Sequence, residues 1–286
     1  NYSRMFSIAL RVLAILVVGY AIVMFLAWRF QHRIAFPAPG GPLPAPSAFG
    51  IPDGRIVTVL TADSIALRGW YLPPNPAPVQ GSSAPALIWF HGNMETVGGI
   101  GAIIGEFRPP GTGLLALDYR GYGQSDGEPT ERGVYRDAEA AWDFLAGQPG
   151  IDRTRIGVYG RSIGSAVALY LTTVRSVAAV VLESAFTSGR EMAREHYALV
   201  PPGLVNLGLN NLDRAGRLSV PLLVIHGTDD WIAPIDMGRA VADTGHAVEF
   251  LVLEGAGHND TYDIGGTLYR DKVLEFLAAH LQSGPR

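Results

Sequence analysis

The chain has 286 residues, a net charge of −4 and no cysteine. A chain of this length suits one α/β domain with appendages. Without cysteine, this sequence has no disulfide framework, no thiolate metal site and no cysteine nucleophile. The weakly negative charge, with no stripe of lysine or arginine, gives no general attraction to nucleic acid, so we expect no nucleic-acid partner.

The N-terminal part of the chain is strongly apolar. From Phe6 to Trp28 only a few small or polar residues and Arg11 interrupt the run, which is long enough to cross a ~30 Å hydrocarbon core. We therefore predict a single transmembrane anchor in residues 1–30. The alternative is a cleaved signal peptide, but residues 28–30 lack the small side chains of a cleavage site. Arginines flank both ends of the run, so charge does not fix its orientation; we expect a single-pass membrane protein with an extracytoplasmic catalytic domain.

The next segment, residues 31–54, is rich in Pro, Gly and Ala and predicts a semi-rigid linker. The catalytic domain is expected in residues 55–286. It opens with two β-prone runs, Arg55 to Leu60 and Ile65 to Tyr71, which are separated by a short polar turn. This pattern predicts an antiparallel hairpin.

From Ala86 onward, short apolar runs alternate with helix-length segments. Strands that are buried on both faces lose the alternation of a half-exposed strand, so the runs predict a mostly parallel sheet with helices on both faces. The predicted strands are Ala86 to Phe90, Leu114 to Leu117, Ile156 to Tyr159, Val177 to Leu182, Leu222 to Ile225 and Val248 to Leu253. The predicted helices are Thr130 to Leu145, Ile163 to Val174, Ile235 to Ala242 and Thr267 to Leu281. In such a sheet the functional loops follow the carboxyl ends of the strands.

The pattern G-x-S-x-G occurs twice, around Ser125 and around Ser162. In a nucleophile elbow, a strand turns sharply into a helix and holds the serine in a strained conformation that the flanking glycines make sterically possible. Ser162 has a predicted strand before it and a predicted helix after it, whose N-terminus stabilises a developing oxyanion. A glycine-flanked turn that only packs closely is the alternative for Ser162. Ser125 lies in a loop with no helix start, and we interpret it as part of a structural turn.

A serine hydroxyl needs a neighbouring base, and a carboxylate orients that base. His258 follows the last predicted strand, in a loop at the carboxyl edge of the sheet, where the base is needed. His246 and His280 suit surface or packing roles instead. Asp229 and Asp230 both follow the strand before that one, and their spacing alone does not decide which of them is the acid.

The oxyanion of an acyl-transfer intermediate needs two N–H donors. In this kind of fold one donor is the residue after the nucleophile, Ile163, and the other lies in the loop after an early strand. Asn93, in His91-Gly92-Asn93, is the expected second donor. A serine nucleophile with an oxyanion hole performs acyl transfer unaided, so we expect no organic cofactor and no metal.

Five segments of the chain together resemble the α/β-hydrolase superfamily. They are His91-Gly92-Asn93, Asp118 to Gly123, Gly160 to Ser165, His226-Gly227-Thr228-Asp229-Asp230 and Gly257-His258. Within the superfamily they are similar to single-pass, membrane-anchored serine hydrolases, whose relatives include acylglycerol lipases and protein depalmitoylases. The resemblance implies an α/β-hydrolase fold over roughly residues 55–281. It also implies that the acid is Asp230, the last Asp of the His-Gly-x-x-Asp motif.

The expected activity is hydrolysis of carboxylic esters through a Ser-His-Asp triad and an acyl-enzyme. Residues 187–218 are long enough for only a small lid and carry many apolar side chains, which either line an acyl channel or pack on the domain. Beside a membrane anchor, they favour a lipophilic acyl substrate. The alternatives are an acyl-protein thioesterase, an amidase or peptidase with the same triad, and a catalytically silent binding protein.

Overall fold

A computed structural model describes residues 2–282 of the chain, so the outermost residues of the predicted anchor and of the predicted catalytic domain, residue 1 and residues 283–286, lie outside the described part. Its centre is an eight-stranded sheet in the order β1-β2-β4-β3-β5-β6-β7-β8. The strands are β1 (Arg55–Leu60), β2 (Ala66–Leu72), β3 (Ala84–Phe90), β4 (Gly113–Leu117), β5 (Ile151–Arg161), β6 (Val180–Glu183), β7 (Leu222–Gly227) and β8 (Glu249–Leu253).

The sheet begins antiparallel and continues parallel. β2 pairs antiparallel with both β1 and β4, and every pairing from β4 to β8 is parallel. The β1–β2 hairpin and the mostly parallel sheet, both predicted from the apolar runs, are therefore confirmed. The strand order places β5, which precedes Ser162, near the middle of the sheet.

Helices cover both faces of the sheet, and the alternating side chains of the strands supply a core to each face. In β3, Ile88 faces a core shared with α3 (Glu131–Ala146), α4 (Ile163–Val174) and α7 (Ile235–Thr244). Its neighbour Trp89 faces the second core, shared with α8 (Thr261–Leu281) and α2 (Gly101–Ile104). This arrangement is the α/β-hydrolase fold, and it explains why the central strands read as continuous apolar runs.

A small insertion lies between β6 and β7, where the lid was predicted. It contains the short helix α5 (Gly189–His196), a 3-10 turn (Pro202–Leu204) and α6 (Asn211–Ala215). We call residues 187–218 the lid. Its second half packs into the core through Val205, Leu207 and Leu209, whereas α5 has no buried residue.

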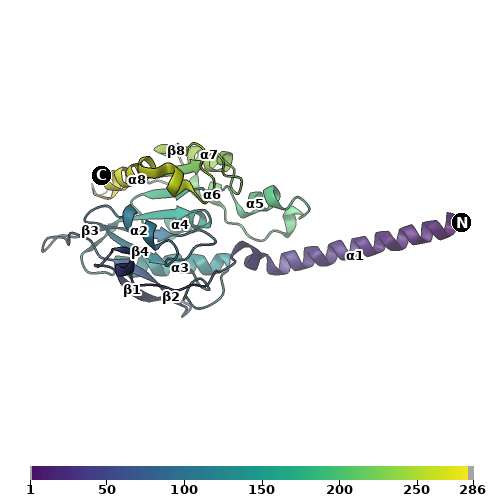
Figure 1. The fold of residues 1–286 in the computed structure, drawn as a ribbon, viewed down its shortest axis with the longest axis horizontal. Coiled ribbons are helices and arrows are strands. Elements are labelled where there is room, and N and C mark those ends of the chain that lie inside the picture. The colour runs from purple at the N-terminus through teal and green to yellow at the C-terminus, as the bar shows by residue number, and fades with distance from the viewer. Residues whose placement is uncertain (1, 283–286) are drawn as a thin grey trace.

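The N-terminal helix α1 (Tyr2–Ala35) projects away from the sheet, on the same side of the domain as α5 (Figure 1). Within the described residues it is the one helix long and apolar enough to cross a membrane. It extends five residues into the segment predicted as a linker. The rest of that segment lies against the domain, because Phe36, Leu43 and Ile51 are buried and the indole of Trp70 donates a hydrogen bond to the carbonyl of Pro44 at 2.9 Å.

Candidate active site

The turn between β5 and α4 holds Ser162 in a strained conformation. Its φ of 52° and ψ of −118° lie in a region that non-glycine residues seldom adopt. Glycine is required on both sides. A Cβ on Gly160 would lie 2.4 Å from the carbonyl oxygen of Gly164, and a Cβ on Gly164 would lie 2.2 Å from that of Phe90. The strand-to-helix context predicted for Ser162 is therefore present in the structure.

Ser125, the serine of the second G-x-S-x-G copy, is engaged in a turn. Its hydroxyl donates to the carbonyl of Asp118 at 2.8 Å and accepts the N–H of Arg68, also at 2.8 Å. The first bond closes the loop after β4 on itself, and the second ties that loop to β2. The hydroxyl of Ser125 thus has a structural partner on each side, in keeping with the structural role expected from its sequence context.

Three side chains from three loops meet at the carboxyl edge of the sheet. His258 follows β8, and its Nε2 lies 2.8 Å from the Oγ of Ser162. Its Nδ1 lies 2.8 Å from Oδ2 of Asp230, which follows β7. Because the carboxylate accepts the Nδ1 proton, Nε2 is left to accept the proton of the serine hydroxyl. The structure therefore brings the three predicted residues into the geometry of a Ser-His-Asp triad.

Asp230 is buried and held from several directions, whereas Asp229 is not part of this cluster. Oδ1 of Asp230 accepts the N–H groups of Ile232 at 3.0 Å and Ala233 at 2.8 Å. Burial alone would raise the pKa of Asp230, but hydrogen bonds from His226 and His258 outweigh it and hold this pKa below its ordinary value. Asp230 therefore stays ionised at neutral pH and can stabilise a protonated His258.

His226 braces the loop that carries Asp230. Its Nε2 donates to the carbonyl of Ala233 at 2.7 Å and lies 3.3 Å from Oδ2 of Asp230. The ring is fully buried against α7, since a Cβ on Gly238 would lie 2.1 Å from its Nδ1. This residue positions the acid and does not reach Ser162.

The two predicted oxyanion donors lie on neighbouring segments. Ile163 is the first residue of α4, and the close approach of Gly164 to the carbonyls of Phe90 and His91 places the loop after β3 against that first turn. The N–H of Gly92 is already donated to Glu95 at 2.5 Å. The side-chain oxygen of Asn93 accepts the hydroxyl of Tyr122 at 3.0 Å, which holds this side chain in place, and the main-chain N–H of Asn93 remains the predicted second donor.

A buried ionic network, which the sequence did not reveal, joins these loops beneath the triad. Arg161 donates to Glu95 in the loop after β3, to Glu183 at the end of β6, and to the carbonyl of His258. Glu183 also accepts the hydroxyls of Tyr159, Tyr269 and Thr261. A carboxylate that ends an otherwise apolar strand is the one signal in the sequence that could have suggested the network. Its effect is to fix the oxyanion loop, the elbow and the base loop relative to one another.

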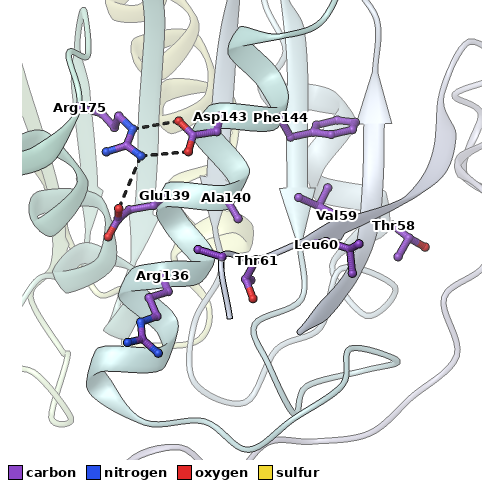
Figure 2. Close-up of a pocket in the computed structure, with 11 residues that line it drawn as sticks. Thr58, Val59, Leu60, Thr61, Arg136, Glu139, Ala140, Asp143, Phe144 and Arg175 are labelled. Atoms are coloured by element: carbon purple, nitrogen blue, oxygen red, sulfur yellow. Dashed lines mark hydrogen bonds and ion pairs between the residues drawn. The ribbon is translucent and has the colours of Figure 1, made fainter. Parts of the chain in front are cut away.

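A separate surface pocket of about 560 Å³ lies between β1 and α3 (Figure 2). None of the residues that line it comes from the loops that carry the triad. Its charged side chains have partners, such as Arg175 with Asp143 at 2.9 Å and Arg136 with Asp63 at 2.8 Å. In residues 2–282 there is also no group of three or more His, Asp or Glu placed to hold a metal ion. The triad is thus the best-supported site for chemistry.

Comparisons with known proteins agree with this architecture. Residues 81–204 match the family described as serine aminopeptidase, S33. An uncharacterized protein of Mycobacterium tuberculosis is 36% identical over 274 residues, which cover 94% of this chain and 95% of that protein. Human α/β-hydrolase domain-containing protein 17B is 33% identical over 201 residues, covering 68% of this chain and 67% of that protein. An esterase from Pyrococcus furiosus shares the fold, with a TM-score of 0.67 at 22% identity over 86% of this chain and 97% of that one.

Proposed function

The chain belongs to the α/β-hydrolase superfamily, and on that premise we propose that it is a membrane-anchored serine hydrolase that cleaves carboxylic esters of lipophilic acyl groups. The observation that carries the proposal is the continuous hydrogen-bonded path from Asp230 through His258 to Ser162, with both links at 2.8 Å. The strained, glycine-flanked elbow at Ser162 supports the assignment of the nucleophile.

The proposed reaction has two acyl-transfer steps. The Oγ of Ser162 bonds to the acyl carbonyl carbon while its proton moves to Nε2 of His258, and the oxyanion accepts hydrogen bonds from the N–H groups of Ile163 and Asn93. The bond from the carbonyl carbon to the alcohol oxygen then breaks, and the alcohol takes the proton from His258. Water attacks the acyl-enzyme in the same way and releases the acid. Asp230 holds the imidazole in its working tautomer throughout.

The preference for a lipophilic acyl group rests on the surroundings of the triad. Met94 follows Asn93, Trp231 follows Asp230, and both side chains are largely exposed apolar groups, at 70% and 75%. The apolar helix α1 leaves the domain on the same side as the lid. We propose single-pass anchoring through α1, with the catalytic domain on the extracytoplasmic side.

An acyl-protein thioesterase is the second candidate. The same triad cleaves a thioester, and an anchored enzyme would meet S-acylated proteins at the bilayer. The two functions differ in the leaving group, which the triad itself does not select.

The test is hydrolysis by the full chain in detergent micelles of p-nitrophenyl esters of graded acyl length, with acyl thioesters in parallel. We expect esters of longer acyl chains to be preferred. Ser162→Ala should lower kcat by about 10⁴-fold or more, and Ser125→Ala, the matched control from the second G-x-S-x-G copy, by less than about tenfold. Loss of activity in Ser125→Ala with retention in Ser162→Ala would show that the nucleophile is wrongly assigned. A preference for the shortest esters would contradict the lipophilic substrate.

A further inference from the structure

The lid is tied to α1 at two points. The hydroxyl of Tyr20 donates to the carbonyl of Leu199 at 2.8 Å, and the N–H of Asn206 donates to the side-chain oxygen of Gln31 at 2.7 Å. Tyr20 and Gln31 are separated by about 16 Å along the helix axis, at ~1.5 Å per residue. We call residues 197–206 the lid tip. It therefore runs alongside the C-terminal part of α1.

These contacts fix the depth of the lid tip relative to the proposed membrane span. Trp28 and Arg29 have the chemistry of a membrane–water interface. Tyr20 lies about 12 Å along the axis from Trp28, on the side of the apolar run. A main-chain group bonded to Tyr20 lies at that same depth, inside the ~30 Å hydrocarbon layer.

The composition of the lid tip suits a lipid environment. Its sequence, Tyr197-Ala-Leu-Val-Pro-Pro-Gly-Leu-Val-Asn206, carries no charged side chain. Leu199 is 79% exposed and Tyr197 is 51% exposed, although each would be expected to seek apolar surroundings. In the protein alone, the tip leaves these side chains in contact with solvent.

Seven of the ten main-chain positions of the lid tip need no water to satisfy an N–H group, which matters in a medium where an unpaired N–H is costly. Two positions are prolines, which have no N–H. The N–H groups of Tyr197, Val200, Leu204 and Val205 donate to carbonyls within the lid, and that of Asn206 donates to Gln31. The carbonyl of Leu199 accepts from Tyr20.

The lid tip adjoins the loop that carries Asp230. The imidazole Nε2 of His196, next to the tip, lies 2.7 Å from the carbonyl of Ile232, whose neighbour Trp231 is 75% exposed. We propose that the lid tip inserts into the acyl-chain layer of the bilayer beside α1, so that the loop that carries Asp230 and Trp231 lies at the membrane surface and the substrate enters from the lipid phase. Insertion of the tip rests on the proposed membrane anchor alone, whereas entry of the substrate from the lipid also rests on the proposed function.

The test measures depth directly, because a chain without cysteine allows a single label at a chosen position. Leu199→Cys in the full chain, labelled with a fluorescent NBD group, is placed in phosphatidylcholine vesicles at high lipid-to-protein ratio. Leu60→Cys on β1 is the matched control, since Leu60 is also a leucine exposed at 69%. Ile22→Cys on α1 reports on the anchor itself.

We expect the label at 199 to be quenched by lipids that carry a nitroxide on the acyl chain and to be protected several-fold from aqueous iodide relative to the label at 60. Equal iodide quenching at 199 and 60, with lipid quenching at 22, would overturn the insertion and leave the anchor intact. Iodide quenching at 22 as well would overturn the anchor too. Protection at 199 that disappears on dilution into excess lipid would show that a second copy, not lipid, covers the tip.

Discussion

Replacing Arg161 by leucine tests whether the buried network holds the site together. The guanidinium is the shared partner of Glu95 and Glu183, and only 11% of its side chain is exposed. Burial alone would lower the pKa of Arg161, but Glu183 and Glu95 outweigh it and raise this pKa above its ordinary value, so the group is fully charged. The variant Arg161→Leu keeps the apolar stem and removes the charge.

The expected cost follows from the carboxylates that are left behind. Removing one partner of a buried ion pair costs about 3–5 kcal/mol, because the remaining charge is buried without compensation. At about 2–4 °C per kcal/mol for a domain of this size, the melting temperature should fall by about 6–20 °C. Arg161→Lys keeps the charge but not the planar fork that reaches several acceptors at once, so its loss should be smaller.

The assay is thermal unfolding of the full chain in detergent, followed by circular dichroism. Arg175→Leu is the matched control, since Arg175 also bonds a carboxylate through two nitrogens, to Asp143 at 3.0 and 2.9 Å, but at the surface. A surface pair is worth about 0–1 kcal/mol, so this control should shift the melting temperature by no more than about 4 °C. Equal shifts in the melting temperature for Arg161→Leu and Arg175→Leu would show that the buried network does not stabilise the fold more than a surface ion pair does.

Two further predictions concern carboxylates. Asp230→Asn should lower kcat by about 10⁴-fold, because an amide leaves His258 in the wrong tautomer, while Asp229→Asn should lower kcat by less than about tenfold. The ester assay measures both variants. A larger loss in Asp229→Asn than in Asp230→Asn would show that Asp229, and not Asp230, is the acid. Hydrogen bonds from Arg120 and Thr61 hold the pKa of Asp63 below its ordinary 3.8, so its stabilising effect is present above pH 3.8 and is lost as the pH falls through the folded-state pKa. Asp63→Asn should therefore be less stable than the parent chain at pH 7, and the difference in urea midpoints should shrink below about pH 4; a constant difference down to pH 2 would contradict this reasoning.

The sequence predicted the parts of the molecule that local pattern determines. The apolar runs located the strands, and the strand-to-helix context separated Ser162 from Ser125 before any geometry was known. Asp229 and Asp230 were inseparable by spacing, because the difference between them lies in which carboxylate accepts the N–H groups of the turn and which faces His258. That orientation is a tertiary property.

Contacts between segments that are distant in the chain could not be predicted from the sequence. Arg161 is 66 positions from Glu95 and 22 from Glu183, and nothing in a single sequence pairs such residues. The proline-rich segment before β1 was expected to be a spacer because its composition disfavours helix and sheet. Its apolar side chains Leu43 and Ile51 are nevertheless buried, since packing of a few side chains does not require regular secondary structure.

Because α1 and His258 lie far apart along the chain, the ribosome completes α1 long before it adds His258. A ribosome that adds about 5–20 residues per second needs about 10–45 seconds to extend the chain from the end of α1 to the base. The proposed anchor is thus available to the membrane well before the last residue of the proposed triad exists. A chain made in this way would acquire a working triad only after its attachment, so that hydrolytic activity would first arise where the enzyme is to act and not in transit.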